Sequence, residues 1–259
     1  MIIVLNTLVK PMMLNTAKTL AGYKLHSLDG EMGTVEEFYF DDHHWTVRYL
    51  VASTGSWLTG RKVLISPYAL TAVNKEEQYI AVNLTNKQIE LSPSYNRHKP
   101  VSRQFEEIYS KYYGLPKYWN GPFMWGSYPN VVRDPKMWRE SIQDEKSWDR
   151  HLRSTSEVEG YVIQASDGDI GNIKDFIIDD ETWAIRYLVV DTGKWWPGKR
   201  VLVSPQWIES VSWDLSTVSV SLSRDAVKQS PEYTDEFLLT RDYEAGLHVH
   251  YDRQGYWND

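Results

Sequence analysis

The sequence contains one segment written twice at a constant spacing of 138 residues. The copies are residues 20–119 and 158–257, and their register continues without a gap from Gly22 and Gly160 to Trp119 and Trp257. The matched pairs between these ends include Asp29 and Asp167, Gly33 and Gly171, Trp45 and Trp183, Arg48 and Arg186, Trp57 and Trp195, Gly60 and Gly198, and Pro67 and Pro205. Chance does not hold a single offset over segments of this length, so the chain is an internal duplication.

Each copy has the pattern of short β-strands separated by turns. In the first copy, Trp45, Val47, Tyr49 and Val51 alternate along one face of a strand that follows a polar turn at residues 41–44. Further strands are predicted at residues 35–40, 62–65, 70–73 and 79–84. Asp-Gly pairs between such strands supply turn residues. Short, closely spaced strands of this kind predict two tandem small antiparallel β-barrels.

A short helix is predicted near the end of each copy. Residues 102–113 and 240–251 place apolar side chains at helical spacing, with Ser102 and Thr240 as N-caps. The stretch between the copies shares nothing with the repeat and contains three prolines. The predicted organisation is therefore an N-terminal extension (1–19), repeat 1 with its helix (20–119), an irregular aromatic and Pro-containing linker (120–157) and repeat 2 with its helix (158–259).

These motifs resemble the PRC-barrel family. The resemblance rests on Gly-Tyr, Asp-Gly, a hydrophobic strand, Trp, Arg-Tyr-Leu-Val, Thr-Gly, Trp, a Gly followed by two basic residues, and Ser-Pro, in residues 20–95 and 158–233. It implies a small β-barrel that serves as a docking module, as in the photosynthetic reaction-centre H subunit and a ribosome-maturation factor. The chain is most similar to soluble bacterial proteins with two such barrels, and it lacks the H subunit's membrane helix and a second RNA-processing domain.

Composition narrows the classes of partner. The chain has no Cys, which excludes disulfides and thiolate metal sites and fits a reducing compartment. Residues 20–119 have 11 Lys/Arg and 11 Asp/Glu, whereas residues 158–257 have 9 and 17, a net charge of −8. No basic stripe suited to nucleic acid is present. The amino-terminal apolar run is too short to span a bilayer. We therefore expect a soluble cytoplasmic protein that binds no nucleic acid and needs no cofactor.

Repeated charges and exposed aromatic residues are the candidate site residues. Arg48 and Arg186 lie inside apolar strands, where a structural ion pair or aromatic stacking is the favoured interpretation. A candidate interaction surface comprises Trp57, Arg61, Lys62, Trp195, Trp196, Lys199 and Arg200. Large aromatics on turns can anchor an interface or pack against the other repeat. The basic pairs fit residues that lead into a strand, or contacts to a partner's carboxylates.

The sequence gives no sign of a catalytic centre. The polar turn containing His43 and His44, and the pair His248 and His250, are explained better by solvated or structural roles than by metal binding. The leading hypothesis is a non-enzymatic interaction or assembly module in which the repeats pack about a pseudo-two-fold axis, with a protein partner or self-association. The alternatives are a small-molecule sensor or enzyme with a site between the barrels, or a ribosomal or photosynthetic accessory role by family analogy.

Overall fold

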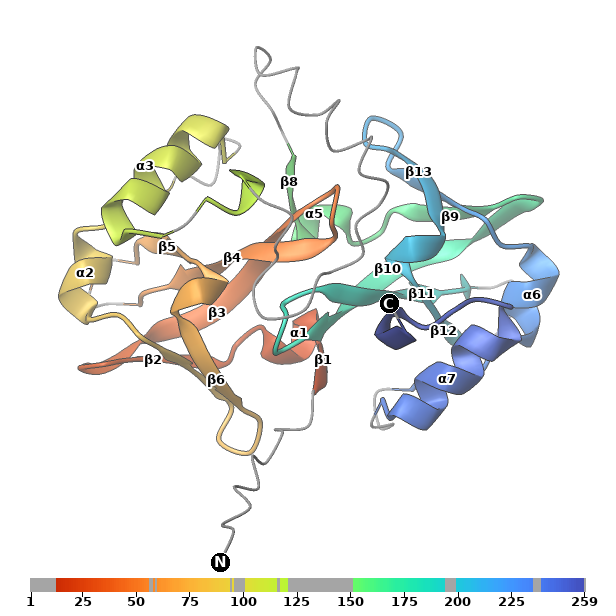
Figure 1. The fold of residues 1–259 in the computed structure, drawn as a ribbon, viewed down its shortest axis with the longest axis horizontal. Helices are drawn as coiled ribbons and strands as arrows, with labels where there is room; N and C mark the ends of the chain where they lie inside the picture. The colour runs from red at the N-terminus through yellow and green to blue at the C-terminus, as the bar shows by residue number, and fades with distance from the viewer. Residues whose placement is uncertain are drawn as a thin grey trace, which may run out of the picture.

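Two β-rich repeats lie side by side in the computed structural model (Figure 1). The structure describes residues 13–55, 58, 60–93, 95, 101–115, 117–120, 151–193, 199–234 and 239–258. Repeat 1 contains β1 (Leu14–Thr16), α1 (Ala17–Leu20), β2 (Lys24–Ser27), β3 (Gly30–Asp41), β4 (Thr46–Ser53), β5 (Lys62–Ile65), the 3-10 helix η1 (Pro67–Ala69), β6 (Leu70–Asn74), β7 (Tyr79–Val82), α2 (Asn86–Glu90), α3 (Arg103–Tyr113) and η2 (Tyr118–Asn120).

Repeat 2 has the same elements in the same order. They are β8 (Leu152–Ser154), α5 (Thr155–Val158), β9 (Val162–Ala165), β10 (Gly168–Asp179), β11 (Ile185–Asp191), β12 (Arg200–Val203), η4 (Pro205–Trp207), β13 (Ile208–Ser212), β14 (Thr217–Val220), α6 (Arg224–Gln229), α7 (Arg241–His250) and η5 (Tyr256–Asn258). The matching order confirms the prediction that one β-rich unit occurs twice. Each copy begins earlier than predicted, because β1 with most of α1 lies in the predicted N-terminal extension (1–19), and β8 with most of α5 lies in the predicted linker (120–157).

Each sheet is open and mixed, where the sequence predicted a closed antiparallel barrel. The strand orders are β5-β4-β3-β2-β7-β6 and β12-β11-β10-β9-β14-β13, and a seventh strand is attached to the long strand of each sheet. All pairs are antiparallel except β2 with β7 and β9 with β14. The edge strands β5 and β6 are connected through η1 and not through a hydrogen-bonded ladder, and β12 and β13 are connected through η4 in the same way. This connection leaves the sheet unclosed.

Each long strand has a glycine at a point of close contact with the neighbouring strand. A Cβ built on Gly33 would lie 2.0 Å from the carbonyl oxygen of Ser53, and one on Gly171 would lie 2.0 Å from that of Asp191. The strand pairings of both regions contain register shifts. The repeated glycine is therefore required by close backbone approach.

Capping residues explain where the helices begin. The Ser102 side chain accepts from the Phe105 amide at the start of α3, and Thr240 accepts from the Tyr243 amide at the start of α7, as the sequence predicts. The short helices α1, α2, α5 and α6 were not predicted from the sequence. The Thr85 capping box with Gln88 is the signal that could have located α2.

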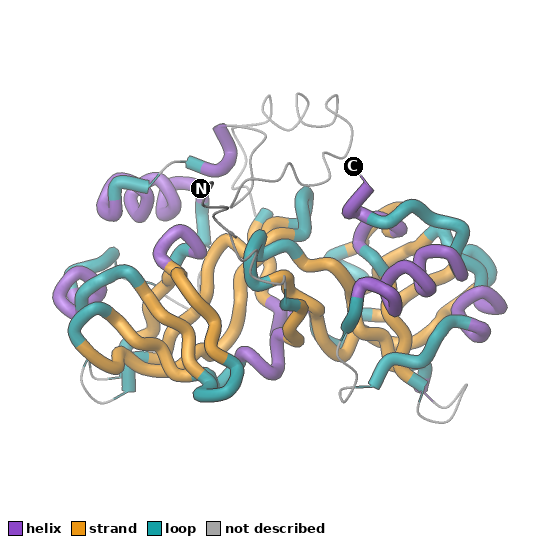
Figure 2. Tube along the Cα trace, turned by 60° about the horizontal axis from the view of Figure 1, so that its bottom comes forward, coloured by secondary structure: helices purple, strands orange, loops and turns teal. Residues whose placement is uncertain are grey.

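The first strand of each repeat belongs to the sheet of the other repeat. β1 pairs with β10, and β8 pairs with β3. The registers are equivalent, because Leu14 lies opposite Asp179 and Leu152 lies opposite Asp41 at the same 138-residue offset. The strands of the two repeats meet in the middle of the molecule (Figure 2). Among the described residues, no helix is long and apolar enough to cross a membrane.

Candidate functional site

The junction between the repeats is built around a two-residue bridge on the pseudo-two-fold axis. Thr46 and Ala184, which are equivalent positions, form an antiparallel bridge. The Val47 amide donates to the carbonyl oxygen of Trp183 at 2.9 Å, and the Ile185 amide donates to that of Trp45 at 2.7 Å. Both tryptophans have positive φ (52° and 59°), an uncommon conformation for a bulky residue. These reciprocal hydrogen bonds hold both turns in that conformation.

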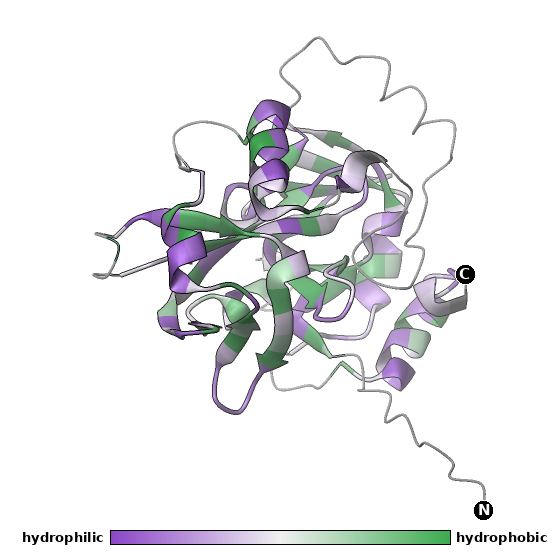
Figure 3. Ribbon diagram, turned by 60° about the vertical axis from the view of Figure 1, so that its left-hand side comes forward, coloured by the Kyte–Doolittle hydropathy of each residue, from purple (hydrophilic) through white to green (hydrophobic). Residues whose placement is uncertain are grey.

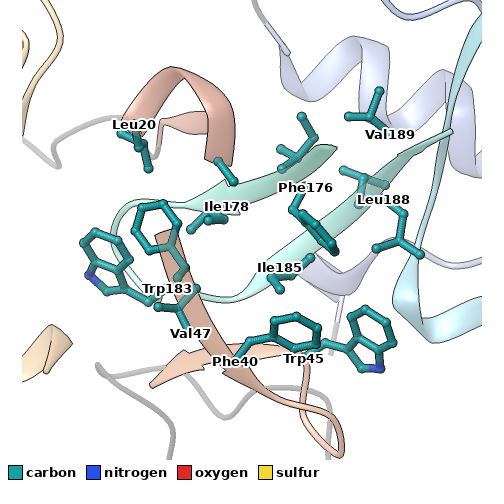
Figure 4. Close-up of a cluster of buried hydrophobic side chains, with 14 of the residues drawn as sticks. Leu20, Phe40, Trp45, Val47, Phe176, Ile178, Trp183, Ile185, Leu188 and Val189 are labelled. Atoms are coloured by element: carbon teal, nitrogen blue, oxygen red, sulfur yellow. The ribbon is translucent and has the colours of Figure 1, made fainter. Parts of the chain in front are cut away.

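Aromatic side chains fill the junction and join the two cores into one. Phe40 stacks on Trp45 with ring centroids 5.1 Å apart and lies 5.8 Å from Phe176, while Phe38 lies 6.3 Å from Trp183 (Figure 4). All five residues are buried in a single hydrophobic cluster that includes residues of both repeats. The repeated Trp45 and Trp183 therefore hold the repeats together. The sequence placed Trp45 at the start of a strand, but the residue lies in the turn before β4.

A small pocket of about 100 Å³ lies on the same axis, between α1, α5, β3 and β10. Its lining consists of equivalent pairs: Ala17 and Thr155, Lys18 and Ser156, Ala21 and Glu159, Glu36 and Lys174, Glu37 and Asp175, and Phe38 and Phe176. Most of its charged groups are already paired. Lys18 Nζ lies 2.5 Å from Glu159 Oε1, and Glu37 accepts hydrogen bonds from the hydroxyls of Ser154 and Ser156. Burial raises the pKa of Asp175.

In repeat 1, Arg48 forms part of a buried ionic network beneath α3. Arg48 Nε lies 2.5 Å from Asp41 Oδ2, and the guanidinium lies 4.0 Å from the centre of the Tyr118 ring. Tyr49 and Tyr118 donate their hydroxyls to Glu106 at 3.2 and 2.6 Å. Burial alone would raise the pKa of Asp41, but the facing Arg48 guanidinium and the contacts with His44 together outweigh it and hold that pKa well below its usual range.

Repeat 2 contains the equivalent network. Arg186 Nη2 lies 2.7 Å from Asp179 Oδ2, and its guanidinium lies 4.0 Å from the Tyr256 ring. Glu244 accepts from the hydroxyls of Tyr187 and Tyr256 at 3.0 and 2.8 Å, and burial raises its pKa. Each of the repeated arginines therefore has both an ion pair and an aromatic contact within its own repeat.

The histidines of the two networks come from different places. In repeat 1, His151 Nε2 lies 3.0 Å from Glu106 Oε2, so the residue preceding β8 reaches across to α3. In repeat 2, His248 of α7 lies 3.0 Å from the Tyr187 hydroxyl, and burial lowers its pKa. The acidic partners Glu106 and Glu244 were missed in the sequence analysis. Their equivalence at the repeat offset, inside amphipathic helices, is the signal that could have identified them.

The basic residues of the predicted interaction surface make contacts within the fold. Arg61 donates to the carbonyl oxygens of Glu90 and Ser92 at 2.7 and 2.5 Å. Lys199 donates to the equivalent carbonyl oxygens of Lys228 and Ser230 at 2.7 and 2.6 Å. These contacts favour the interpretation that Arg61 and Lys199 lead into a strand. They also join the start of β5 to the end of α2, and the start of β12 to the end of α6.

The remaining predicted residues are only partly described. Lys62 pairs with Glu36, and Arg200 is half-buried at the start of β12. Trp57, Trp195 and Trp196 lie outside the described residues, so their role as interface anchors stays a prediction.

The histidine-rich turn and the histidine pair of α7 have structural partners. His44 Nδ1 lies 3.0 Å from Asp41, and His250 Nε2 lies 2.8 Å from the Ala226 carbonyl oxygen. In the part of the chain that the structure describes, no three His, Asp or Glu side chains gather as a metal site would require. The ionisable groups described here therefore link strands, helices and repeats.

Comparison with known proteins identifies one domain. Residues 153–220, from β8 to the end of β14, match the PRC-barrel domain family. An uncharacterised protein of Deinococcus radiodurans is 41% identical over 64 residues, which are 25% of this chain. The match covers 23% of that relative, so the chain spans less than a quarter of its length.

Proposed function

We propose that a chain with a PRC-barrel domain at residues 153–220, preceded by a second unit of the same topology, acts as a non-enzymatic assembly module that binds other proteins. The observation that carries this proposal is the reciprocal exchange of β1 and β8. The exchange joins two similar units into one body, as in a homodimer whose subunits have been fused. Such a body presents two related outer faces at a fixed separation, which suits a scaffold.

The buried polar groups support this proposal. Arg48, Arg186, Glu106 and Glu244 are the groups from which an acid–base or anion site would be built, yet each is engaged by neighbouring side chains beneath a helix. They stabilise the docking of α3 and α7 on the sheets. Within the described fold, these buried ionisable groups therefore hold the helices and sheets together, which supports a non-enzymatic role.

The pocket that the described residues form between α1, α5, β3 and β10 is too small to support the sensor or enzyme alternative. Sites for small organic ligands have volumes of roughly 300–1,000 Å³, whereas this pocket holds about 100 Å³. The net charge of −8 on residues 158–257 likewise disfavours RNA as the partner.

Affinity purification of the tagged full-length chain from its source cells tests the proposal. We expect a defined set of proteins to be retained in near-stoichiometric amounts, and fewer of them with a Trp195→Ser/Trp196→Ser variant, since these residues are the predicted anchors. A parallel screen should find no metabolite that raises the melting temperature. Retention of no protein, together with a metabolite that stabilises the chain at low concentration, would overturn the proposal.

A further inference from the structure

Repeat 1 has an exposed apolar surface on its two outer helices. Leu91 at the end of α2 is 63% exposed, and Ile108 and Tyr112, one turn apart on α3, are 60% and 41% exposed. The Tyr112 hydroxyl donates to the Gln88 carbonyl oxygen at 2.8 Å, which fixes α3 against α2. We call these three residues, with Lys87 and Glu90, the α2–α3 face. Figure 3 brings this side of the molecule forward and shows hydrophobic and hydrophilic residues alternating along its helices.

Repeat 2 shows that the fold does not require this apolar surface. The residues equivalent to Leu91, Ile108 and Tyr112 are Gln229, Gly246 and His250.

The contact between the two helices is nevertheless retained in repeat 2. His250 Nε2 lies 2.8 Å from the Ala226 carbonyl oxygen, just as the Tyr112 hydroxyl bonds to the equivalent Gln88. The same architecture therefore forms without large apolar side chains at these three positions. Large apolar groups on a face that does not need them indicate an interaction surface.

The charges on this face are self-complementary. Lys87 and Glu90 are exposed and belong to no ion pair within the described residues. In an isologous contact, residue i of one copy meets residue j of the other, and j meets i. Two α2 helices packed antiparallel would therefore bring Lys87 next to Glu90 twice.

The overall charge also favours approach through repeat 1. Residues 20–119 carry no net charge, while residues 158–257 carry −8. Two copies therefore repel one another through repeat 2 and not through repeat 1.

We propose that the α2–α3 face binds a second copy of this chain in an isologous, antiparallel contact. This inference names a first partner for the proposed assembly module. The functional meaning of the dimer rests on the proposed function, whereas the contact itself does not. A standard stable interface buries roughly 800 Å² per partner, and three partly exposed side chains supply less than this. The dimer is therefore weak and reversible, forming as the protein concentration rises.

Cross-linking of the full chain tests the location of the contact. The protein contains no Cys, so a single introduced thiol is the only one present. Ile108→Cys should be joined into covalent dimers by a short bis-maleimide several-fold faster than the matched variant Val249→Cys, whose position on α7 of repeat 2 is 79% exposed. Equal rates at the two positions would overturn the proposal.

Charge reversal tests the self-complementary pairing. In a sedimentation-velocity concentration series, Lys87→Glu and Glu90→Lys should each weaken dimerisation by about 3- to 10-fold, because each reversal turns two attractions into repulsions. The double variant should regain wild-type association, and Glu76→Lys, an exposed change outside the face, should have no such effect. A chain that stays monomeric throughout the series, or a double variant no better than the single ones, would contradict the contact. Partner proteins retained by a monomeric chain would leave the assembly role standing and remove only the self-association.

Discussion

Two arginines set the internal electrostatics of the molecule. Arg48 is 1% exposed and Arg186 is 9% exposed, and each faces a carboxylate that is also buried. Transfer of such charges from water costs several kcal/mol per ion, which the attraction between them offsets only when both partners are present. Loss of one member of such a pair is therefore strongly destabilising, because the other member remains as a buried charge without a counterion.

Replacement of Arg48 by Met should therefore destabilise the protein strongly. We expect the free energy of unfolding at pH 7 to fall by about 3–5 kcal/mol, since Asp41 remains buried without its main counterion. Urea denaturation followed by tryptophan fluorescence measures the change. The control Lys24→Met removes the exposed Lys24–Glu31 pair and should change that free energy by less than about 1 kcal/mol. Similar losses in both variants would contradict the proposed importance of burial.

The same pair predicts a pH dependence. Because the folded-state pKa of Asp41 lies below the ordinary value of 3.8, its contribution is fully present above pH 3.8 and is lost as the pH falls toward the folded pKa. Arg48→Met removes the largest influence that lowers this pKa, so the pKa of Asp41 is higher in the variant than in the wild type, and protonation recovers part of the lost stability. The difference in unfolding free energy between wild type and variant should be largest near neutral pH and shrink below pH 4. A difference that is constant with pH would contradict the ionised pairing of Asp41.

At the scale of elements, a glycine shapes each long strand. Gly171 lies where β10 passes within van der Waals distance of the Asp191 carbonyl oxygen on β11, and Gly33 is its counterpart. The N-terminal part of β10, which includes Gly171, pairs with β9, and its C-terminal end pairs with β1. The repeat preserves this glycine for a steric reason and not for flexibility.

Two glycine-to-alanine substitutions distinguish a glycine required by close backbone contact from one that is not. Gly171→Ala places a methyl group 2.0 Å from a backbone oxygen, and we expect it to lower the unfolding free energy by at least about 2 kcal/mol. Gly246→Ala, in the exposed face of α7 with no atom within 4 Å, should raise it by about 0.5–1 kcal/mol. Thermal unfolding of both variants provides the measurement. An unchanged unfolding free energy in Gly171→Ala would show that β10 and β11 can move apart at this position without loss of stability.

Local sequence patterns predicted most of the longer strands and helices, but they did not predict which strands pair with one another. The strands at residues 46–53 and 62–65 and the capped helices α3 and α7 follow from alternation, turn residues and Ser102 or Thr240. The exchange of β1 and β8 does not follow, because three-residue strands carry no periodic signal and their pairing is decided by distant residues. The parallel pairing of β2 with β7 was missed for the same reason. The networks around Arg48 and Arg186 were half visible in the sequence. The repeated arginines and their nearby partners Asp41 and Asp179 were evident, whereas Glu106 and Glu244 lie far away in the chain.

In the whole molecule, neither repeat is complete without the other. β1 completes the sheet of repeat 2, β8 completes that of repeat 1, and the Thr46–Ala184 bridge joins them on the axis. Separation of the repeats would bring Phe40, Trp45 and their counterparts at the junction into water. A continuous core of this kind makes the two repeats one cooperative unit.

Each repeat produced alone should therefore form a homodimer or be poorly soluble. In a homodimer of residues 151–259, β8 would pair with β10 of the other copy, as β1 does in the full chain, and the same turns would meet on a true two-fold axis. Sedimentation velocity gives the mass of the species, and residues 1–120 mixed with residues 151–259 should form a 1:1 complex because the exchanged strands are equivalent. Soluble, folded monomers of either fragment would mean that the sheet is stable without its exchanged strand. The fused-dimer origin of the assembly would then lose its physical basis.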